Sequence, residues 1–344
     1  MTENVLFEQL QNLNANELEE VSGIILQMLS HAKGSEITSN SHIETCRKCG
    51  GTHITKHGKD RHGKQRYKCA SCGCTFTAAS YSTISYSHYS EKKWRKYIEL
   101  LLRGDSLRAC SKECNISLPT AFYWRHKILN ALQYDQKERK LSGVIEMDDT
   151  FFGVSYKGNH KKSKNFVMPR KALKRGTDNT GWINEKVCVM CAEERNGQVY
   201  GEVLGIGAAN VPKLSYAFDE RILDDSICIA DSIQTYKTYF KEKPVQLIQV
   251  VSPTNKRSKK RFAEKKSAFH IQNVNNFHQR FRKFMRGYNG VATKYLNHYV
   301  NLFVWIENHK QMSLSQTMTE YLANKSCYLS ARKITEKPAL PEVA

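Results

Sequence analysis

Three acidic residues stand inside an otherwise apolar, β-prone run at residues 144–153, VIEMDDTFFG. In a strand, Glu146 and Asp148 would share one face, and Asp149 would face the other way. Burying a carboxylate without a positive partner is strongly unfavourable. The run therefore predicts a cation beside these acids.

A fourth acid, Asp231, ends a later apolar run that reads SICIAD. Acids at strand ends, beside loops, are where α/β folds assemble their sites. Two carboxylates from separate strands could hold Mg²⁺, and a pair of such ions can clamp the attacking and leaving oxygens of a phosphodiester. These acids therefore predict chemistry on a nucleic-acid backbone. The alternative is a pair of salt-bridged or surface acids.

Two cysteine pairs, CRKCG at 46–50 and CASCG at 69–73, have the Cys-x2-Cys spacing of a four-thiolate zinc ribbon. The chain has 11 cysteines and no recognisable secretory signal, so metal binding is a better explanation than a disulfide framework. Such a short segment buries too little apolar surface to fold alone, and the metal would supply the folding energy. The predicted ligands of one structural Zn²⁺ are Cys46, Cys49, Cys69 and Cys72.

Residues 105–129, DSLRACSKECNISLPTAFYWRHKIL, have the rhythm of a helix-turn-helix. Asp105 or Ser106 can cap the first helix. Ser117 would cap the second helix, with Pro119 in the first turn, where a missing N–H costs nothing. An ordinary helical hairpin is the competing interpretation. The side chains that could reach a DNA groove are Thr120, Tyr123, Arg125 and Lys127.

The chain is strongly basic, with a net charge of +20 and a pI near 9.4. The excess is uneven, because residues 1–35 hold five acids and only one lysine. A chain this basic usually partners a polyanion, most often nucleic acid, although a merely basic solvated surface is the alternative. We see no transmembrane run and no signal-peptide pattern, so we expect a cytoplasmic protein with no membrane partner and no nucleotide cofactor.

Composition and periodicity divide the chain into five parts. Strand-like runs dominate from residue 144, where Asn196-Gly197 predicts a hairpin turn, and residues 267–310 return to a helical pattern. The five parts are an N-terminal helical segment at 1–35, a zinc ribbon at 44–78, a helix-turn-helix domain at 90–134, an α/β domain at 143–312 and a C-terminal tail at 313–344.

The order of these parts resembles that of DDE-type transposases from bacterial insertion sequences that carry an N-terminal zinc ribbon, the ISXO2-like group. The match covers roughly residues 44–310. It implies a ribonuclease-H-like catalytic domain, with a mixed sheet and helices, that cleaves and transfers DNA strands. The segments that carry the resemblance are EMDDTFF at 146–152, which is similar to a Glu-x-Asp-Glu-Thr-Tyr motif, IADSIQTY at 229–236, and a histidine-led helix at 270–300.

Residue by residue, the resemblance implies that Asp148 and Asp231 ligate two catalytic Mg²⁺ ions. The family commonly has Glu at the third position, whereas this chain places Asn275 there, with Asn276 as the alternative in the neighbouring register. An amide oxygen can ligate Mg²⁺ but carries no charge. Glu146, on the same strand face as Asp148, could offset the missing charge.

Two basic clusters flank the predicted acidic site in sequence. Residues 157–175 hold eight Lys and Arg and no acid, and residues 256–266 hold seven with one Glu. Each cluster could grip a DNA backbone. Arg282 and Lys283 lie near the family's basic position and could contact phosphate. The cluster residues that we single out as DNA contacts are Lys161, Lys162, Arg170, Lys171, Lys259 and Lys260.

The sequence therefore predicts a transposase that binds the terminal inverted repeats of its element and its target DNA. It would cleave and join strands with Mg²⁺, as a homo-oligomer on paired ends. One alternative is a zinc-dependent DNA-binding regulator or a decayed transposase remnant with an inert α/β domain. A nuclease without strand transfer is a third interpretation. The distinguishing feature is whether Asp148 and Asp231 converge on one site.

Overall fold

The computed structural model describes residues 43–61, 63–158, 186–250, 269–324 and 327–338. The predicted helical segment at 1–35 and nearly all of both basic clusters lie outside these ranges. The contacts within the chain divide it into two compact units, which are Met1–His88 with Ser315–Ser326, and Tyr89–Leu314 with Cys327–Ala344.

The first unit contains an antiparallel sheet of three short strands in the order β1-β2-β3. The core of this sheet is small, because its buried apolar residues are Cys46, Cys69 and Phe76, with Tyr67 stacked on Phe76. A core of this size cannot by itself offset the conformational entropy of folding. The strands are β1 (Ile54–Lys59), β2 (Gln65–Cys69) and β3 (Thr75–Thr77), and helix α12 (Leu314–Asn324) belongs largely to the same unit.

The second unit begins with three helices, α3 (Glu91–Leu102), α4 (Leu107–Glu113) and α5 (Leu118–Glu138). The hydroxyl of Ser106 accepts the backbone N–H of Ala109 at the start of α4. The hydroxyl of Ser117 accepts the N–H of Thr120 at the start of α5, whose first turn contains a proline. These caps are the ones expected from the sequence, and the helices form where it predicts them.

A five-stranded mixed sheet lies at the centre of the second unit, in the order β6-β5-β4-β7-β8. β4, β5 and β6 pair antiparallel, whereas β7 pairs parallel to both β4 and β8. The hairpin between β5 and β6 turns at Gly197, which has a φ of 94°. The predicted mixed α/β fold is confirmed. The strands are β4 (Val144–Gly153), β5 (Lys186–Glu194), β6 (Val199–Ile206), β7 (Ile227–Asp231) and β8 (Gln246–Val250).

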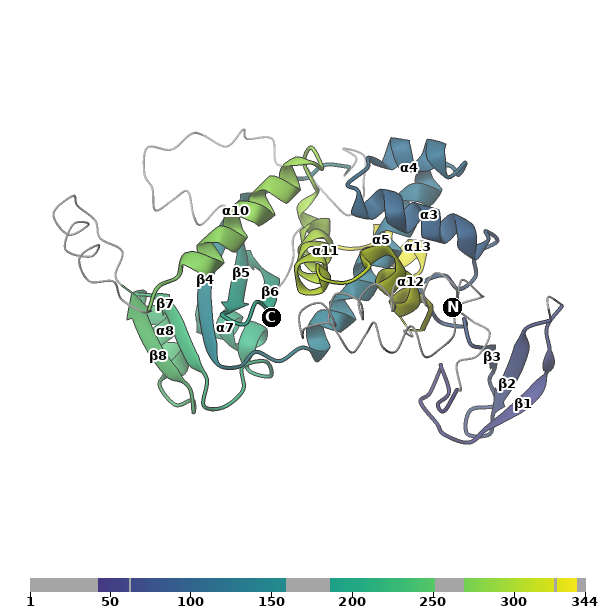
Figure 1. The fold of residues 1–344 in the computed structure, drawn as a ribbon, viewed down its shortest axis with the longest axis horizontal. Coiled ribbons are helices and arrows are strands. Elements are labelled where there is room, and N and C mark those ends of the chain that lie inside the picture. Colours follow the sequence, from purple (N-terminus) through teal and green to yellow (C-terminus); the bar gives the residue numbers. More distant parts are fainter. Residues whose placement is uncertain (1–42, 62, 159–185, 251–268, 325–326, 339–344) are drawn as a thin grey trace, which may run out of the picture. The chain divides into compact units, whose positions relative to one another are not determined.

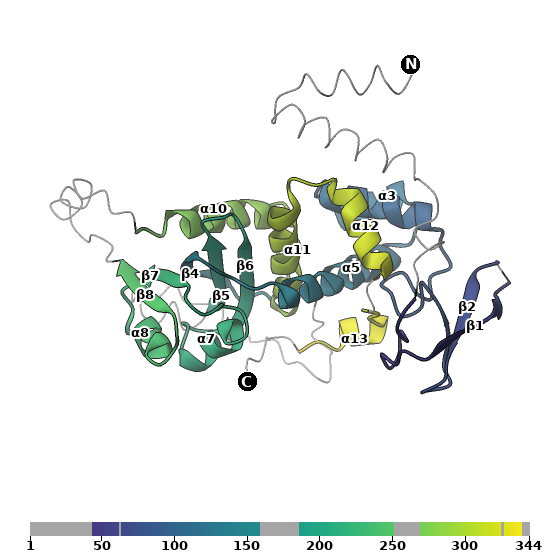
Figure 2. The ribbon, with the colours of Figure 1, turned by 60° about the horizontal axis from the view of Figure 1, so that its bottom comes forward.

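Helices cover both faces of this sheet, so that it forms the middle of three layers (Figures 1 and 2). On one face, α7 (Val211–Phe218) and α8 (Gln234–Phe240) pack on the apolar side chains of β4, β5 and β7. On the other face, α10 (Gln272–Arg286) and α11 (Leu296–His309) pack on β5 and β6, with the short helix η1 (Thr293–Tyr295) between them. Figure 1 shows α10 crossing β4 and β5.

The long helix α5 joins the first helices of this unit to the sheet layer. Gln136 near its end is buried and donates to Asn301 of α11 at 2.5 Å, and its side-chain oxygen accepts the N–H of Gly201 in β6. Helices α3–α5 and the sheet therefore belong to one compact unit. The predicted C-terminal tail holds α12 and a further helix, α13 (Ala331–Thr335), whose Ile334 is fully buried.

Candidate active site

Asp148 and Asp231 lie side by side on two parallel strands. β4 and β7 pair with Met147 opposite Ala230, and each aspartate is the next residue on its strand. Met147 and Ala230 face the core beneath α7 and α8. Because side chains alternate along a strand, Asp148 and Asp231 face the other side of the sheet, which α10 covers. The structure thus brings together the two acids that the sequence singled out.

The surroundings of Asp148 disfavour its negative charge. Its side chain is 21% exposed. Burial, together with the negative charges of Asp149 and Asp231, raises the pKa of Asp148 from 3.8 to about 7, although Arg282 favours the charged form. A divalent cation here would remove that penalty. The clustered carboxylate oxygens therefore fit Mg²⁺, which prefers hard oxygen ligands.

Asp149 points away from this pair, as the strand alternation predicts. Its carboxylate accepts a weak hydrogen bond from the thiol of Cys188, 3.7 Å away, on the α7 and α8 side of the sheet. Burial raises the pKa of Asp149 as well. Asp148 and Asp149 are therefore adjacent in sequence but serve opposite faces.

Glu146 does not face an open site, although it shares a strand face with Asp148. Its side chain is fully buried and accepts the backbone N–H groups of Asn273 at 2.8 Å and of Val274 at 3.3 Å. The Asn273 side chain donates a third hydrogen bond, and His270 and Arg195 lie within 3.3 and 3.7 Å. The residue preceding α10, Ile271, offers no side-chain cap.

Glu146 therefore caps the amino terminus of α10 from a distance of 127 residues in sequence. A carboxylate stabilises the exposed N–H groups and the positive end of the helix dipole there. The suggestion that Glu146 offsets the charge missing at Asn275 is wrong, because its oxygens are already engaged. Its role is to hold α10 over β4.

One stripe of α10 faces the acid pair. Asn275, His278 and Arg282 are spaced by three and four residues, so they lie on one side of the helix. Nδ1 of His278 is 3.8 Å from an oxygen of Asp148, and Arg282 donates to the hydroxyl of Thr150 at 2.6 Å. Asn275 therefore stands on the stripe that faces β4.

Asn276 lies on another side of α10 and is exposed. Helix geometry turns it about 100° from Asn275, away from the acid pair. Its position on the stripe makes Asn275 the better candidate of the two for the third ligand.

His278 is a residue of this site that the sequence reasoning missed. Burial, aided by the positive charge of Arg282, lowers its pKa to about 4, so the imidazole is neutral near pH 7. Its Nε2 is buried without a hydrogen-bond partner among the described residues. The signal in the sequence was its position three residues after Asn275, on the same helical stripe.

The four cysteines converge as the zinc-ribbon spacing predicts. Their sulfur atoms all lie within 4.8 Å of one another, and the pairs Cys46–Cys72 and Cys49–Cys69 are each 3.7 Å apart. Four thiolates arranged tetrahedrally at the usual zinc–sulfur distance would be about 3.8 Å apart. This cluster can hold one zinc ion.

Local features shape the two cysteine knuckles. Gly50 and Gly73, which follow them, have φ angles of 74° and 66°, a conformation that favours glycine. Backbone hydrogen bonds from Cys72 and Ser71 lower the pKa of Cys69 to about 6. A thiolate at neutral pH is the form that binds a metal.

The structure changes the interpretation of the predicted DNA contacts in α5. Arg125 is 2% exposed and donates to the backbone carbonyl of Asp105 at 2.6 Å, so the predicted groove contact of this side chain is wrong. Lys127 is half-buried, with its ammonium 5.0 Å from the centre of the Tyr328 ring. Both side chains serve packing within the second unit.

The other predicted contacts divide into two sets. Arg282 and Lys283 are exposed on α10, and Arg282 is tied to β4 through Thr150. The remaining predicted DNA contacts lie outside the described residues, and they are Lys161, Lys162, Arg170, Lys171, Lys259 and Lys260.

Among the described residues, no helix is both long enough and apolar enough to cross a membrane. No curated protein matches the chain. The solved structures with some similarity include three complexes of the Mos1 transposase. The paired-end complex with the left transposon end is 10% identical, covers 64% of this chain and 80% of that chain, and has a TM-score of 0.19.

The Mos1 strand transfer complex is also 10% identical, covers 64% of this chain and 79% of that one, and has a TM-score of 0.19. A pre-cleavage Mos1 transpososome is 11% identical, covers 82% and 91% of the two chains, and has a TM-score of 0.18. These TM-scores are too low to establish a shared fold.

A family model gives a firmer result. The ISXO2-like transposase domain matches residues 140–308. This range contains all five strands of the mixed sheet and helix α10, and with them Asp148, Asp231 and Asn275. The segment from 140 to 308 is therefore similar to the ISXO2-like transposase domains.

Proposed function

We propose that this chain is the DNA transposase of a bacterial insertion sequence. The observation that carries the proposal is that Asp148 and Asp231 stand side by side facing α10, inside the segment that matches the transposase domain. Two adjacent carboxylates with an uncompensated charge are suited to bind cations that act on phosphodiesters. The net charge of +20 supports DNA as the substrate.

The strand arrangement supports a ribonuclease-H-like catalytic domain. Its first three strands, β4, β5 and β6, form an antiparallel meander, and β7 and β8 continue the sheet in parallel from the other edge of β4. This is the sheet expected for that fold. Asp148 lies on the first strand and Asp231 at the end of the fourth, so both acids lie near the centre of the sheet.

We propose that Asp148, Asp231 and Asn275 would hold two Mg²⁺ ions. Bound there, the ions would stabilise negative charge on the attacking and leaving oxygens of the scissile phosphate. Asn275 offers an amide oxygen from the stripe of α10 that faces the pair. Its missing charge would weaken the hold on the second ion compared with a carboxylate.

Two neighbouring residues of α10 would complete the site. Arg282, whose guanidinium lies beside Thr150, would contact a phosphate of the DNA strand. His278, neutral and buried against Asp148, would hold the orientation of that carboxylate. Lys283 is exposed one position further and would add a backbone contact.

DNA would be bound by parts outside the sheet. The zinc ribbon, the helix pair α4 and α5, and the two basic clusters are proposed to contact the inverted repeats and the target. We propose a homo-oligomer on paired ends, because a transposase must hold two ends to join both to one target. The alternative function is a zinc-dependent DNA-binding regulator or a decayed transposase remnant. The observation that favours it is Asn275, an uncharged residue at the position of the third metal ligand.

The test is a strand cleavage and joining assay with labelled element-end DNA and Mg²⁺ or Mn²⁺. Wild type should cut and join, and Asp148→Asn and Asp231→Asn should lose at least about a thousandfold in rate while still binding DNA. Asp149→Asn is the matched control, because Asp149 faces the opposite side of the sheet, and it should retain most activity.

Two further variants test the third ligand. Asn275→Ala should lose most joining activity, and Asn276→Ala should keep it. Wild type that binds end DNA but never cuts it with either metal would establish the regulator or remnant instead. Equal activity of Asp148→Asn and Asp149→Asn would remove the proposed catalytic pair.

A further inference from the structure

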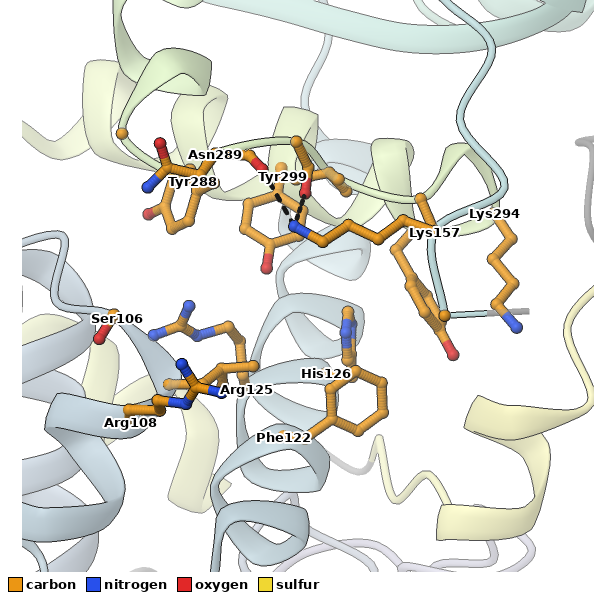
Figure 3. A pocket seen from close by; sticks show the side chains of 17 residues that line it. Ser106, Arg108, Phe122, Arg125, His126, Lys157, Tyr288, Asn289, Lys294 and Tyr299 are labelled. Atoms are coloured by element: carbon orange, nitrogen blue, oxygen red, sulfur yellow. Dashed lines mark hydrogen bonds between the residues drawn. The ribbon is translucent and has the colours of Figure 1, made fainter. Parts of the chain in front are cut away.

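A cavity of about 590 Å³ lies in the second unit, between the first half of α5 and the loop that joins α10 to α11. Figure 3 shows Arg108, Arg125, Phe122 and His126 on one side of it, and Tyr288 and the following loop on the other. Asp148 of β4 and Asp231 of β7 do not line this cavity, and none of the other metal-binding residues proposed above does.

The charges around the cavity have one sign. Four cations line it, and no acidic side chain does so among the described residues. His126 is neutral, because burial lowers its pKa to about 3. The cavity is therefore suited to an anion. The four cations are Arg108, Arg125, Lys157 and Lys294.

Two buried polar atoms at the cavity have no partner among the described residues. They are Nε of Arg125, a side chain that is 2% exposed, and the hydroxyl of Tyr288. The guanidinium carbon of Arg125 is 5.7 Å from the centre of the Tyr288 ring. Burying a cation without a counter-charge is costly. Because no acidic side chain among the described residues lines the cavity beside Arg125, a ligand that brings a negative charge would suit it.

The walls of the cavity are also aromatic. Phe122 and Tyr295 stand edge to face with their ring centres 5.7 Å apart, and Tyr288 and Tyr299 line the opposite wall. A bare phosphate would fill only a small part of this volume and would not use the aromatic walls. A planar nucleobase attached to a phosphate would use both the rings and the cations.

The wall formed by the loop is fixed in place. The ammonium of Lys157, which follows β4, donates to the carbonyls of Asn289 and Gly290 at 3.0 and 3.1 Å (Figure 3). This bond joins the segment after the catalytic strand to the loop after α10. The cavity therefore has walls from both the helical part and the sheet layer of the second unit.

We propose that this cavity receives one unpaired nucleotide of a bound DNA strand, with its base among the aromatic rings and its phosphate against the cations. A base-paired duplex is too wide to enter, so the nucleotide must be unstacked or single-stranded. A nucleotide of DNA, rather than a free nucleotide, is the ligand that suits a transposase, and in this respect the inference rests on the proposed function.

The experiment uses the zinc-loaded full chain and a short single-stranded thymidine oligomer that carries one 5-iododeoxyuridine. Light should cross-link the modified base to the peptide that contains Phe122, Tyr288 or Tyr295. Phe122→Leu, which keeps an apolar side chain, should weaken single-strand binding roughly 5- to 150-fold, as expected for one lost stacking contact. Its affinity for duplex DNA should fall much less than its affinity for the single strand.

A second pair of variants tests whether a cation must line the cavity or whether any exposed cation on α4 is sufficient. Arg108 and Lys112 are both exposed cations on α4, but only Arg108 lines the cavity. Arg108→Ala should weaken single-strand binding several-fold more than Lys112→Ala. Equal effects of these two variants, or cross-links that map outside the cavity, would overturn the proposal.

Competition with thymidine monophosphate tests whether the cavity binds a free nucleotide or a nucleotide within a DNA strand. If it binds as tightly as the oligomer and blocks the cross-link, the ligand is a free nucleotide and the strand proposal is wrong. The joining assay is scored separately. Wild type that cross-links in the cavity but never cuts DNA would refute the proposed function and keep the nucleotide site.

Discussion

The two groups of candidate metal ligands in this chain would depend on metal in opposite ways. In the first unit, four cysteine sulfurs converge around a sheet whose buried apolar core is three residues. In the second unit, Asp148 and Asp231 stand on a sheet with apolar layers on both faces. The proposed zinc would therefore hold its unit folded, whereas we expect the unit around the aspartates to fold without the proposed Mg²⁺ ions.

The two clusters also differ in how the absence of metal would affect the stability of the unit around them. Without metal, the unit that contains the cysteine cluster has little buried apolar surface to keep it folded. Without metal, the repulsion between the buried aspartates would destabilise the second unit, whose large core can tolerate this cost. The pKa of Asp148, raised by burial, reflects that unfavourable energy. Under the proposed function, the cysteine cluster would be needed for structure, and the aspartate pair would reduce stability while serving the chemistry.

The largest expected effect is the loss of the first unit on removal of zinc. Chelation, or Cys49→Ser, should unfold the small sheet and expose its thiols, with the second unit intact. All four tryptophans lie between residues 89 and 314, so tryptophan fluorescence reports the second unit alone. Labelling of Cys46, Cys49, Cys69 and Cys72, resolved by peptide mass, reports the first unit.

The control for this experiment is Cys74→Ser, because Cys74 follows the second knuckle but is outside the four-sulfur group. It should keep zinc and normal thiol protection at the other positions. If chelation shifted the tryptophan melting curve as much as it exposed the thiols, the contrast between the two units would be wrong.

The next effect is a gain of stability from Asp148→Asn. The pKa of Asp148 in the folded state, about 7, exceeds its ordinary value of 3.8. Below about pH 4 the carboxyl is protonated in both the folded and the unfolded state, and its contribution to the stability of the folded state is fully present. That contribution is lost as the pH rises through 7. At pH 8, in zinc-loaded buffer without Mg²⁺, Asp148→Asn should be more stable by about 2–4 kcal/mol.

Urea unfolding followed by tryptophan fluorescence at pH 4 and pH 8 checks this prediction. The difference between variant and wild type should vanish at the lower pH. Adding Mg²⁺ at pH 8 should stabilise wild type and leave the variant unchanged. A variant that is less stable than wild type at pH 8 would show that the carboxylate is structural, like the thiolates.

The smallest effect of the three is expected from Glu146→Gln. The substitution keeps the shape but replaces one acceptor oxygen with an NH₂ group that faces the N–H groups of α10. Losing charge-assisted hydrogen bonds at this buried helix terminus should cost about 2–3 kcal/mol. Urea unfolding followed by tryptophan fluorescence gives the measurement.

Glu99→Gln serves as the comparison, since Glu99 is exposed on α3 and its substitution should change stability little. Asp148 and Glu146 share one face of β4, so opposite signs for their substitutions would separate the reactive acid from the structural one. A stabilising effect of Glu146→Gln would place Glu146 in the metal site after all.

Features set by neighbouring residues could be predicted from the sequence. The cysteine knuckles, with Gly50 and Gly73 at positive φ, and the Ser106 and Ser117 caps depend on residues a few positions apart. The alternation of side chains along a strand also assigns Asp148 and Asp149 to opposite faces, because their positions differ by one. These features follow from local geometry.

Features set by distant partners could not be predicted in this way. The carboxylate of Glu146 meets α10 across 127 residues, and an acid on the same face as Asp148 looks like a ligand until that helix is placed. Arg125 was expected to reach a DNA groove because it is a charged residue on the predicted second helix, but the backbone carbonyl of Asp105 and the ring of Tyr288 enclose it. Burial depends on packing that no short stretch of sequence encodes.

Helix α5 carries a further consequence. It begins at the cap expected for a DNA-reading helix and ends in hydrogen bonds to α11 and β6, a span of 21 residues or about 30 Å. That length equals roughly nine base pairs of B-form DNA. Under the proposed function, the length of α5 would fix the distance between the DNA sequence that is recognised and the phosphodiester bond that is cleaved. An inserted base pair between them should therefore disturb the reaction more than a substituted one.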